Sequence, residues 1–346
     1  MKNKKRLILW ILLVLLIVAC AVVVAYLYKQ KLSGSGDGIL NTAEVNTTPI
    51  VVEQKKVQIY QGNDRPIAVM IDNHKDALPQ AGLGKAYMVY EIIVEGGESR
   101  LMALFKGADL AKIGPVRSSR HYFLDYALEN DAIYVHFGWS PEAQSDISTL
   151  GVNNLNGLYE SAGFWRVKDK KAPHNAVTST EKILEMANKK GYRTTSDATS
   201  VLNYTVDAVN LTDGIAANNI TLPYSQSNSV KWTYDADTLR YQRYSKGIKQ
   251  TDWDTGEAVT AKNIIVEFIE NSTLNDGENK DRQTMDTTGT KDGYYITNGK
   301  AIKIKCTKSS RSSKTVYKDL SGNEIKVNDG NTFVQICPIN ANVTIE

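Results

Sequence analysis

The N-terminal segment constrains this chain more than any other part. An apolar run, residues 7–28, contains no charged residue and no proline, and it comes after the basic residues Lys2, Lys4, Lys5 and Arg6. As an α-helix this run would span roughly 33 Å, enough to cross the hydrocarbon core of a bilayer. The positive-inside rule keeps the basic end in the cytoplasm and places the chain beyond residue 28 outside. We therefore expect an extracytoplasmic protein held at the cytoplasmic membrane by its N-terminus.

Cys20 leaves a second kind of anchor open. Residues 17–20 read Ile-Val-Ala-Cys, which resembles a bacterial lipobox, where the cysteine is lipidated and the preceding peptide is removed. Residues 21–28 stay apolar, whereas a lipoprotein usually turns polar soon after its cysteine. A single-pass signal anchor and a lipid anchor on Cys20 are both compatible with the sequence, and both place the same region outside.

Composition and pattern divide the chain into four expected parts. They are a signal anchor or signal peptide at 1–31, a flexible tether at 32–64, an α/β domain at 65–194 and a mainly antiparallel β domain at 195–346. The tether is predicted from its Gly- and Ser-rich start. The net charge of +3 is modest, so nucleic acid is not an expected partner.

Strand and helix patterns interleave only in the first folded part. We expect its strands at residues 67–71, 87–94, 101–105 and 133–137, and its helices at residues 121–130, 141–150 and 179–190. This alternation predicts a layered α/β arrangement. From about residue 195 strands dominate, and Asn298-Gly299 between two alternating runs predicts a tight hairpin. The expected fold class of the whole is α+β.

Two cysteines lie beyond the anchor, Cys306 and Cys337. Both fall in alternating, strand-like segments, and an exported protein can form disulfides. The sequence allows a Cys306–Cys337 disulfide, and it equally allows two buried thiols that act as small apolar side chains.

Candidate functional residues gather in the first folded part, at the ends of predicted elements. All four histidines of the chain lie there: His74, His121, His136 and His174. In α/β sheets, ligands bind beyond the carboxyl ends of the strands, where such loops meet. We therefore expect any binding or chemistry to belong to this part of the chain.

Residues 114–121, which read Gly-Pro-Val-Arg-Ser-Ser-Arg-His, suggest an anion site. Two arginines, two hydroxyls and a predicted helix N-terminus can together hold phosphate. The predicted ligand-binding residues are Asn73, Arg100, Arg117, Ser118, Ser119, Arg120, His121 and Asn175. In the alternative reading, the arginines pair with Glu91, Glu95 or Asp125 and only stabilise the fold.

Catalysis is left open by the sequence. Asp72, His74 and His174 are the candidates for an acid or base, because they carry titratable groups in the same set of loops. The chain contains neither a His-Glu-x-x-His motif nor a His-x-His spacing. We therefore predict neither a metal site nor a cofactor.

Several separate segments resemble one bacterial family. Residues 65–73, 89–91, 95–97, 114–118 and 172–175 look, in the same order, like the YerB family of two-domain (DUF3048-type), membrane-anchored proteins. The segments around Cys306 and at residues 329–333 resemble its smaller C-terminal domain. The resemblance implies an anchored envelope protein with two domains, and it implies no reaction.

A second likeness concerns the order of elements alone. A strand, a hairpin, an arginine-containing loop and a further strand and helix resemble the LytR-CpsA-Psr enzymes, which move polymers from polyprenyl pyrophosphate carriers onto the cell wall. That likeness implies pyrophosphate binding by Arg117 and Arg120, assisted by Arg100 and Arg166. The arginine- and aspartate-rich segments characteristic of those enzymes do not occur here.

The sequence thus favours an envelope protein whose first domain binds an anionic ligand, such as a wall precursor that carries phosphate or pyrophosphate. One alternative is an envelope phosphotransferase or hydrolase that uses the same residues. The other is a non-catalytic surface adaptor that binds a protein partner.

Overall fold

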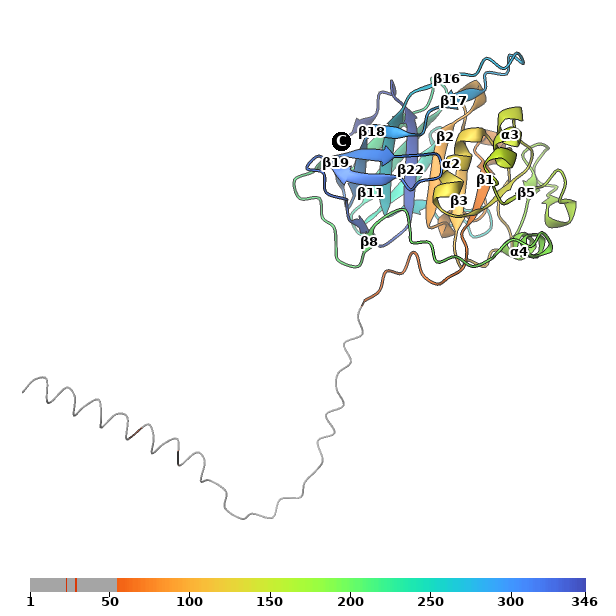
Figure 1. The fold of residues 1–346 in the computed structure, drawn as a ribbon. Coiled ribbons are helices and arrows are strands. Elements are labelled where there is room, and N and C mark those ends of the chain that lie inside the picture. Colours follow the sequence, from red (N-terminus) through yellow and green to blue (C-terminus); the bar gives the residue numbers. More distant parts are fainter. Residues whose placement is uncertain (1–22, 24–28, 30–54) are drawn as a thin grey trace, which may run out of the picture. The chain divides into compact units, whose positions relative to one another are not determined.

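A mixed β-sheet forms the centre of the computed structural model, which describes Val23, Lys29 and residues 55–346 (Figure 1). Its strands are β1 (Ile67–Asp72), β2 (Met88–Ile93), β3 (Ser99–Phe105), β4 (Ile133–His136), β5 (Asn154–Asn156), β9 (Ile215–Ala216), β15 (Asn263–Ile269), β18 (Gly289–Thr297), β19 (Lys300–Lys308), β20 (Val316–Asp319) and β22 (Thr332–Pro338). Within the described residues these eleven strands adopt the order β20-β19-β18-β15-β22-β2-β3-β1-β4-β5, with β9 beside β19.

A second, smaller sheet is built from the later part of the chain. It contains β10 (Asn219–Pro223), β11 (Ser229–Asp235), β12 (Arg240–Ser245), β13 (Ile248–Lys249), β14 (Thr260–Ala261) and β23 (Thr344–Ile345). Three short ribbons pair β6 (Trp165–Arg166) with β7 (Ala176–Val177), β8 (Tyr204–Thr205) with β21 (Val327–Asn328), and β16 (Asn271–Thr273) with β17 (Gln283–Met285).

The predicted helices form where local signals place them: α2 (His121–Glu129), α3 (Pro141–Thr149) and α4 (Thr180–Lys189). The Ser140 hydroxyl accepts a hydrogen bond from the third residue of α3, whose first residue is proline. Ser179 caps α4 in the same way. Such caps satisfy backbone N–H groups that have no partner inside the helix. Asn298-Gly299 forms the tight turn between β18 and β19, as predicted.

The large sheet is covered on both faces. In β1, Val69 and Ile71 belong to one apolar cluster while Ala68 and Met70 belong to another, as the two-residue period of a strand requires. The first cluster includes side chains of α4 and of the smaller sheet. The second includes side chains of α2 and α3, which lie on the large sheet in Figure 1. The α+β class predicted from the sequence is confirmed.

Strands from both sides of residue 194 share the large sheet. β22 lies between β15 and β2 and runs parallel to both, so a strand near the C-terminus pairs directly with one from the first predicted domain. Lys55–Glu346 accordingly form one compact unit. The contacts of this unit begin before residue 65, because the backbone N–H groups of Gln58 and Ile59 donate to the carboxylate of Asp329.

The anchor predicted at residues 1–31, with Cys20, and most of the predicted tether lie outside the described residues. In the part of the chain that the structure describes, we find no helix with both the length and the apolar character needed to cross a bilayer.

Cys306 and Cys337 are both buried and free, so the allowed disulfide is not formed in the structure. Cys306 lies in β19 and Cys337 in β22, and two strands, β18 and β15, separate them in the sheet. The two side chains also belong to the apolar clusters on opposite faces. Both thiols therefore act as small core side chains.

Candidate functional site

Three segments that are distant in sequence meet at the carboxyl end of β1. β1 and β4 run parallel as far as Val69 and Val135. Beyond that point residues 115–117 run alongside β1, since Asp72 N–H donates to Pro115 O at 2.8 Å and Arg117 N–H donates to Met70 O at 2.9 Å. The next segment joins through Val116 N–H, which donates to Ala176 O at 2.6 Å. Residues 72–74, 115–117 and 174–176 are thereby held together by backbone hydrogen bonds.

Asp72 is the centre of this meeting point. Its Oδ2 lies 2.8 Å from His174 Nδ1 and 3.3 Å from Arg117 Nε. Its Oδ1 accepts a hydrogen bond from the backbone N–H of His74 at 3.1 Å. Because a carboxylate accepts the Nδ1 hydrogen, the neutral His174 ring keeps the lone pair on Nε2. The arrangement can therefore present an oriented base.

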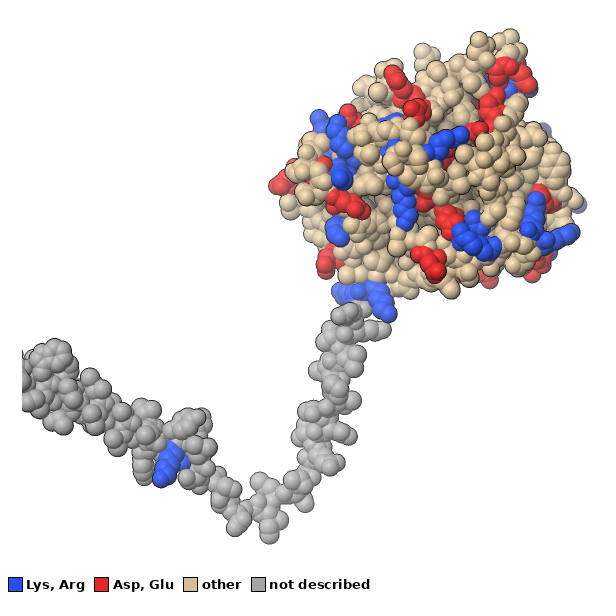
Figure 2. All heavy atoms as spheres, viewed as in Figure 1, with Lys and Arg blue, Asp and Glu red and all other residues tan. Residues whose placement is uncertain are grey.

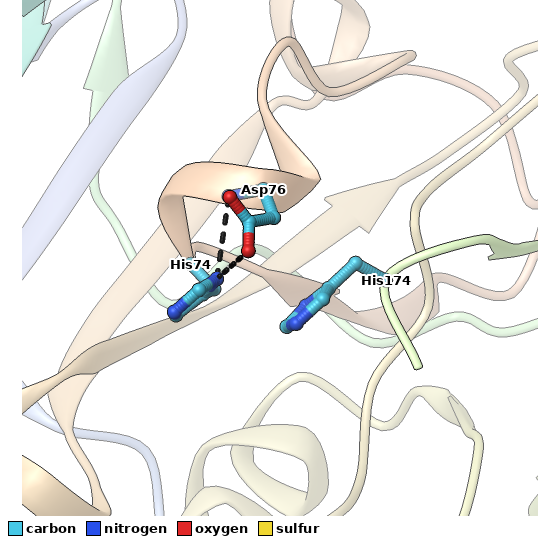
Figure 3. Close-up of side chains that lie close together, drawn as sticks. All are labelled: His74, Asp76 and His174. Atoms are coloured by element: carbon cyan, nitrogen blue, oxygen red, sulfur yellow. Dashed lines mark hydrogen bonds and ion pairs between the residues drawn. The ribbon is translucent and has the colours of Figure 1, made fainter. Parts of the chain in front are cut away.

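His74 stacks against His174. The ring centroids are 4.5 Å apart and the planes differ by 13°. Figure 3 shows the two rings side by side, with Asp76 above His74. His74 is the N-cap of the short 3-10 helix Lys75–Ala77, and its Nδ1 accepts a hydrogen bond from Asp76 N–H at 3.2 Å. This capping bond orients the His74 ring toward His174.

Two arginines, Arg117 and Arg100, lie next to Asp72, and Glu95 links a third, Arg120, to Arg100. Arg100 in β3 faces Asp72 across the strand pair and donates to Ser118 O at 2.6 Å. Glu95 lies 3.9 Å from Arg100 and pairs with Arg120. We call this group, together with the histidines and Asp76, the strand-end cluster, and it consists of Asp72, His74, Asp76, Glu95, Arg100, Arg117, Arg120 and His174. Its three guanidinium groups are matched by the three carboxylates of Asp72, Asp76 and Glu95.

Burial and mutual repulsion act on the charges within the cluster. Burial, with the neighbouring Arg120 as the next cause, lowers the pKa of Arg100 to about 10. Burial alone would raise the pKa of Glu95, but the hydrogen bond and charge of Arg120 outweigh it and the pKa is lowered. Both groups are thus charged at neutral pH.

Four predicted ligand-binding residues face other partners. The Ser119 hydroxyl is fully buried and accepts from Tyr134. The Ser118 hydroxyl donates to Phe137 O. His121 Nε2 lies 3.2 Å from Thr284 Oγ1, away from the cluster. Asn175 bonds to Val167 and Arg166: its Nδ2 donates to Val167 O and its Oδ1 accepts from Arg166. Each of these bonds holds a loop or helix in place.

Asn73 points into the protein. Its Nδ2 donates to Glu91 Oε1 and to Ser99 Oγ, at 3.1 and 2.9 Å. Glu91 in turn pairs with Arg243 of β12 at 2.8 Å, and both side chains are 0% exposed. This buried polar group joins the large sheet to the smaller one directly behind the strand-end cluster.

The alternative prediction, in which the arginines pair with nearby carboxylates and only stabilise the fold, is confirmed for one of the three carboxylates. Arg120 pairs with Glu95, as that reading predicts, whereas Glu91 pairs with Arg243 and Asp125 with Arg311. The remaining histidine, His136, is buried and bonded to Gly138 O and Asn154, and burial lowers its pKa.

Sequence reasoning missed Asp76 and Arg243. Asp76 comes two residues after His74, and the spacing His-x-Asp could have singled it out as a neighbour of the ring. Arg243 lies in the pattern Arg-Tyr-Gln-Arg-Tyr-Ser of β12, where Tyr241, Arg243 and Ser245 all face inward. The strand period marks position 243 as buried, but no local signal identifies a partner 152 residues away.

The surface charge is mixed on the face of the described region that Figure 2 shows. On the face drawn in Figure 2, Lys and Arg side chains are interspersed with Asp and Glu. On this face, therefore, no broad basic surface would attract an anion, and the binding proposal depends on the local donors of the strand-end cluster.

Comparison with known proteins identifies two family models along the chain. The family described as "Protein of unknown function (DUF3048) N-terminal domain" matches residues 53–193. Its companion, "Protein of unknown function (DUF3048) C-terminal domain", matches residues 220–334. The "Putative lipoprotein YerB" of Bacillus subtilis (strain 168) is 33% identical over 305 residues, which cover 85% of this chain and 84% of that protein.

A solved structure agrees. The crystal structure of the YerB protein from Bacillus subtilis matches with a TM-score of 0.73 and 29% sequence identity, over 82% of this chain and 94% of that one. The resemblance inferred from residues 65–73, 114–118 and 172–175 is thereby confirmed. The chain belongs to the YerB family, which is defined by the paired N- and C-terminal DUF3048 domains.

Proposed function

We propose that this chain is a membrane-anchored, extracytoplasmic protein of the cell envelope that binds a phosphate-bearing anionic ligand at the strand-end cluster. The basic residues and apolar run at the N-terminus support the anchor. The name of the Bacillus relative, which calls it a lipoprotein, supports a lipid anchor at the same end. Either anchor leaves residues 55–346 outside the membrane.

The binding proposal rests on Arg117, whose side chain is partly exposed and only partly paired. Its side chain is 27% exposed, and Asp72 holds it through Nε at 3.3 Å. Among the described residues no other side-chain partner of Arg117 is found, so its two terminal amino groups remain available. A planar guanidinium held in this way can donate two parallel hydrogen bonds to a phosphate group. Arg100 and Arg120 add positive charge behind it.

Pyrophosphate binding to the full-length protein in detergent and EDTA, measured by isothermal titration calorimetry, tests this proposal. We expect saturable binding that Arg117→Ala weakens at least 10-fold, because a charge-assisted bidentate contact contributes more than about 1.4 kcal/mol. Arg193→Ala is the matched control, since Arg193 is also exposed and paired with an aspartate, Asp131. Equal binding by wild type and Arg117→Ala would refute the site. No binding by any variant would favour the protein-binding adaptor.

A second function is favoured by the Asp72–His174 contact. A histidine held at 2.8 Å by a carboxylate can remove or deliver a proton through Nε2. Placed beside arginines that bind phosphate, it would serve a phosphotransferase or hydrolase. Turnover of a pyrophosphate ester that is lost in His174→Ala, with pyrophosphate binding retained, would establish the enzyme.

A further inference from the structure

We propose that His74, Asp76 and His174 bind a divalent transition-metal ion of the zinc class. The three side chains come from two loops that the backbone bonds around Asp72 bring together (Figure 3). This inference goes beyond anion binding, because the metal ligands are not the arginines. It also differs from the prediction made from the sequence, which contains no familiar metal-binding spacing.

The spacing of the donor atoms suits a metal ion. One nitrogen of each histidine and one oxygen of Asp76 all lie within 4.8 Å of one another. His74 Nδ1 and Asp76 Oδ2 are 3.6 Å apart, close to the roughly 3.4 Å between neighbouring ligands in a tetrahedral zinc site. The donors farthest apart must approach by up to about 1.4 Å, and the two stacked rings must turn so that their in-plane lone pairs converge on the ion, which side-chain rotation allows. Asp76 can rotate, since its side chain is 60% exposed.

Asp72 prepares His174 for this role. A histidine that binds a metal almost always donates its other ring N–H to a carboxylate or a carbonyl, which fixes the tautomer and raises the basicity of the free nitrogen. His174 Nδ1 already donates to Asp72 at 2.8 Å and leaves Nε2 free. Binding through His74 Nδ1 replaces only the long 3.2 Å hydrogen bond from Asp76 N–H.

The ligand set determines the class of ion. Two imidazoles and one carboxylate are typical of zinc and its neighbours, whereas magnesium and calcium prefer oxygen ligands alone. Three protein ligands leave a fourth position open to water. Arg117 and His174 both contact Oδ2 of Asp72, so an anion held by Arg117 can offer an oxygen to that position. The cluster thus has a cation-binding half and an anion-binding half, which share Asp72.

To test this, bound metal is first removed from untagged full-length protein with EDTA, and the EDTA is then removed. The protein is titrated with Zn²⁺ alone and, separately, with Co²⁺ alone. We expect one Co²⁺ per chain, with the intense visible absorption of a four-coordinate ion that Zn²⁺ abolishes. His74→Gln and His174→Asn should each weaken Zn²⁺ binding at least 100-fold. Asp72→Asn should weaken it about 10- to 100-fold, as loss of an outer carboxylate does. His121→Gln, which alters a histidine outside the cluster, should leave it unchanged.

The absence of stoichiometric Zn²⁺ binding to the wild type would overturn the metal site, and so would equal affinity in wild type, His74→Gln and His174→Asn. The Co²⁺ spectrum of the wild type does not depend on the folding of any variant. Neither titration contains phosphate, and the pyrophosphate experiment contains EDTA. Failure of the metal site and failure of the anion site are therefore separate results.

Discussion

The buried group around Glu91 and the strand-end cluster use the same kinds of side chain in opposite settings. Glu91 and Arg243 are both 0% exposed and paired at 2.8 Å, and Asn73 and Ser99 hold the remaining oxygen of Glu91. Arg117, by contrast, is reached by solvent and held by Asp72 through one nitrogen. The two groups are neighbours in the chain, because Asn73 of the first is the residue after Asp72 of the second.

The difference separates charges that stabilise the fold from charges available for binding. Removing one member of a buried ion pair leaves the other charge without compensation, which is strongly destabilising. Removing Arg117 should change stability less, because solvent reaches Arg117 and the buried Asp72 keeps its contacts with His174 and with the backbone N–H of His74. The same strand end thus has a buried inner face, where Arg243 pairs with Glu91 although its Nε and Nη1 have no hydrogen-bond partner among the described residues, and an outer face where solvent reaches Arg117.

The largest effect on stability should come from Arg243→Met. This change keeps the volume but leaves Glu91 buried without its cation, and we expect the free energy of unfolding to fall by about 3–5 kcal/mol. Urea denaturation at pH 7 measures it. The double variant Glu91→Gln with Arg243→Met should recover a good part of the loss, because no uncompensated charge remains. If the free energy of unfolding of Arg243→Met fell by less than about 1 kcal/mol, the buried Glu91 group would contribute no more to stability than a surface ion pair, and the contrast with the strand-end cluster would be wrong.

A smaller effect should come from Glu267, a carboxyl of β15 that is 2% exposed and whose Oε2 has no hydrogen-bond partner among the described residues. Burial, with the nearby Glu129 charge as the next cause, raises the pKa of Glu267 to about 8. In the unfolded chain a glutamate has a pKa of about 4.3. Between these pH values the folded protein holds the additional proton, so stability falls as the pH rises from about 4 to about 8.

Glu267→Gln should therefore raise the free energy of unfolding at pH 8 by about 1–3 kcal/mol and make it less dependent on pH between about 5 and 8. Urea denaturation at a series of pH values provides the comparison with wild type. An unchanged pH dependence in the variant would mean that Glu267 is compensated in the folded state. It would then belong with Glu91 among the paired buried charges.

Local sequence rules account for the individual elements. Ser140 before Pro141 starts α3, Ser179 starts α4, and Asn298-Gly299 turns β18 into β19, each through hydrogen bonds or dihedral angles of a few adjacent residues. The loops of the strand-end cluster could also be predicted, because they lie after strands or before helices. These are the parts of the molecule where structure is determined locally.

Pairings between distant residues could not be predicted in the same way. β22 inserts parallel between β15 and β2, and the apolar pattern of a buried strand is the same whichever neighbour it has. The sequence likewise shows His174 and Asp72 as two loop residues, and only the fold brings them to 2.8 Å. For Cys306 and Cys337 the sequence left a disulfide and two buried thiols equally open, and only the strand order, which separates the two cysteines, decides between them.

The most direct test of the contrast measures the free energy of unfolding of wild type and Arg117→Ala, each with and without pyrophosphate. Without ligand, we predict that the two differ by less than about 1 kcal/mol. With pyrophosphate at about 100 times its dissociation constant, the wild type should gain about 2.7 kcal/mol and Arg117→Ala much less at the same concentration. A loss of several kcal/mol without ligand, or an equal gain in both proteins, would contradict the assignment of Arg117 to ligand binding.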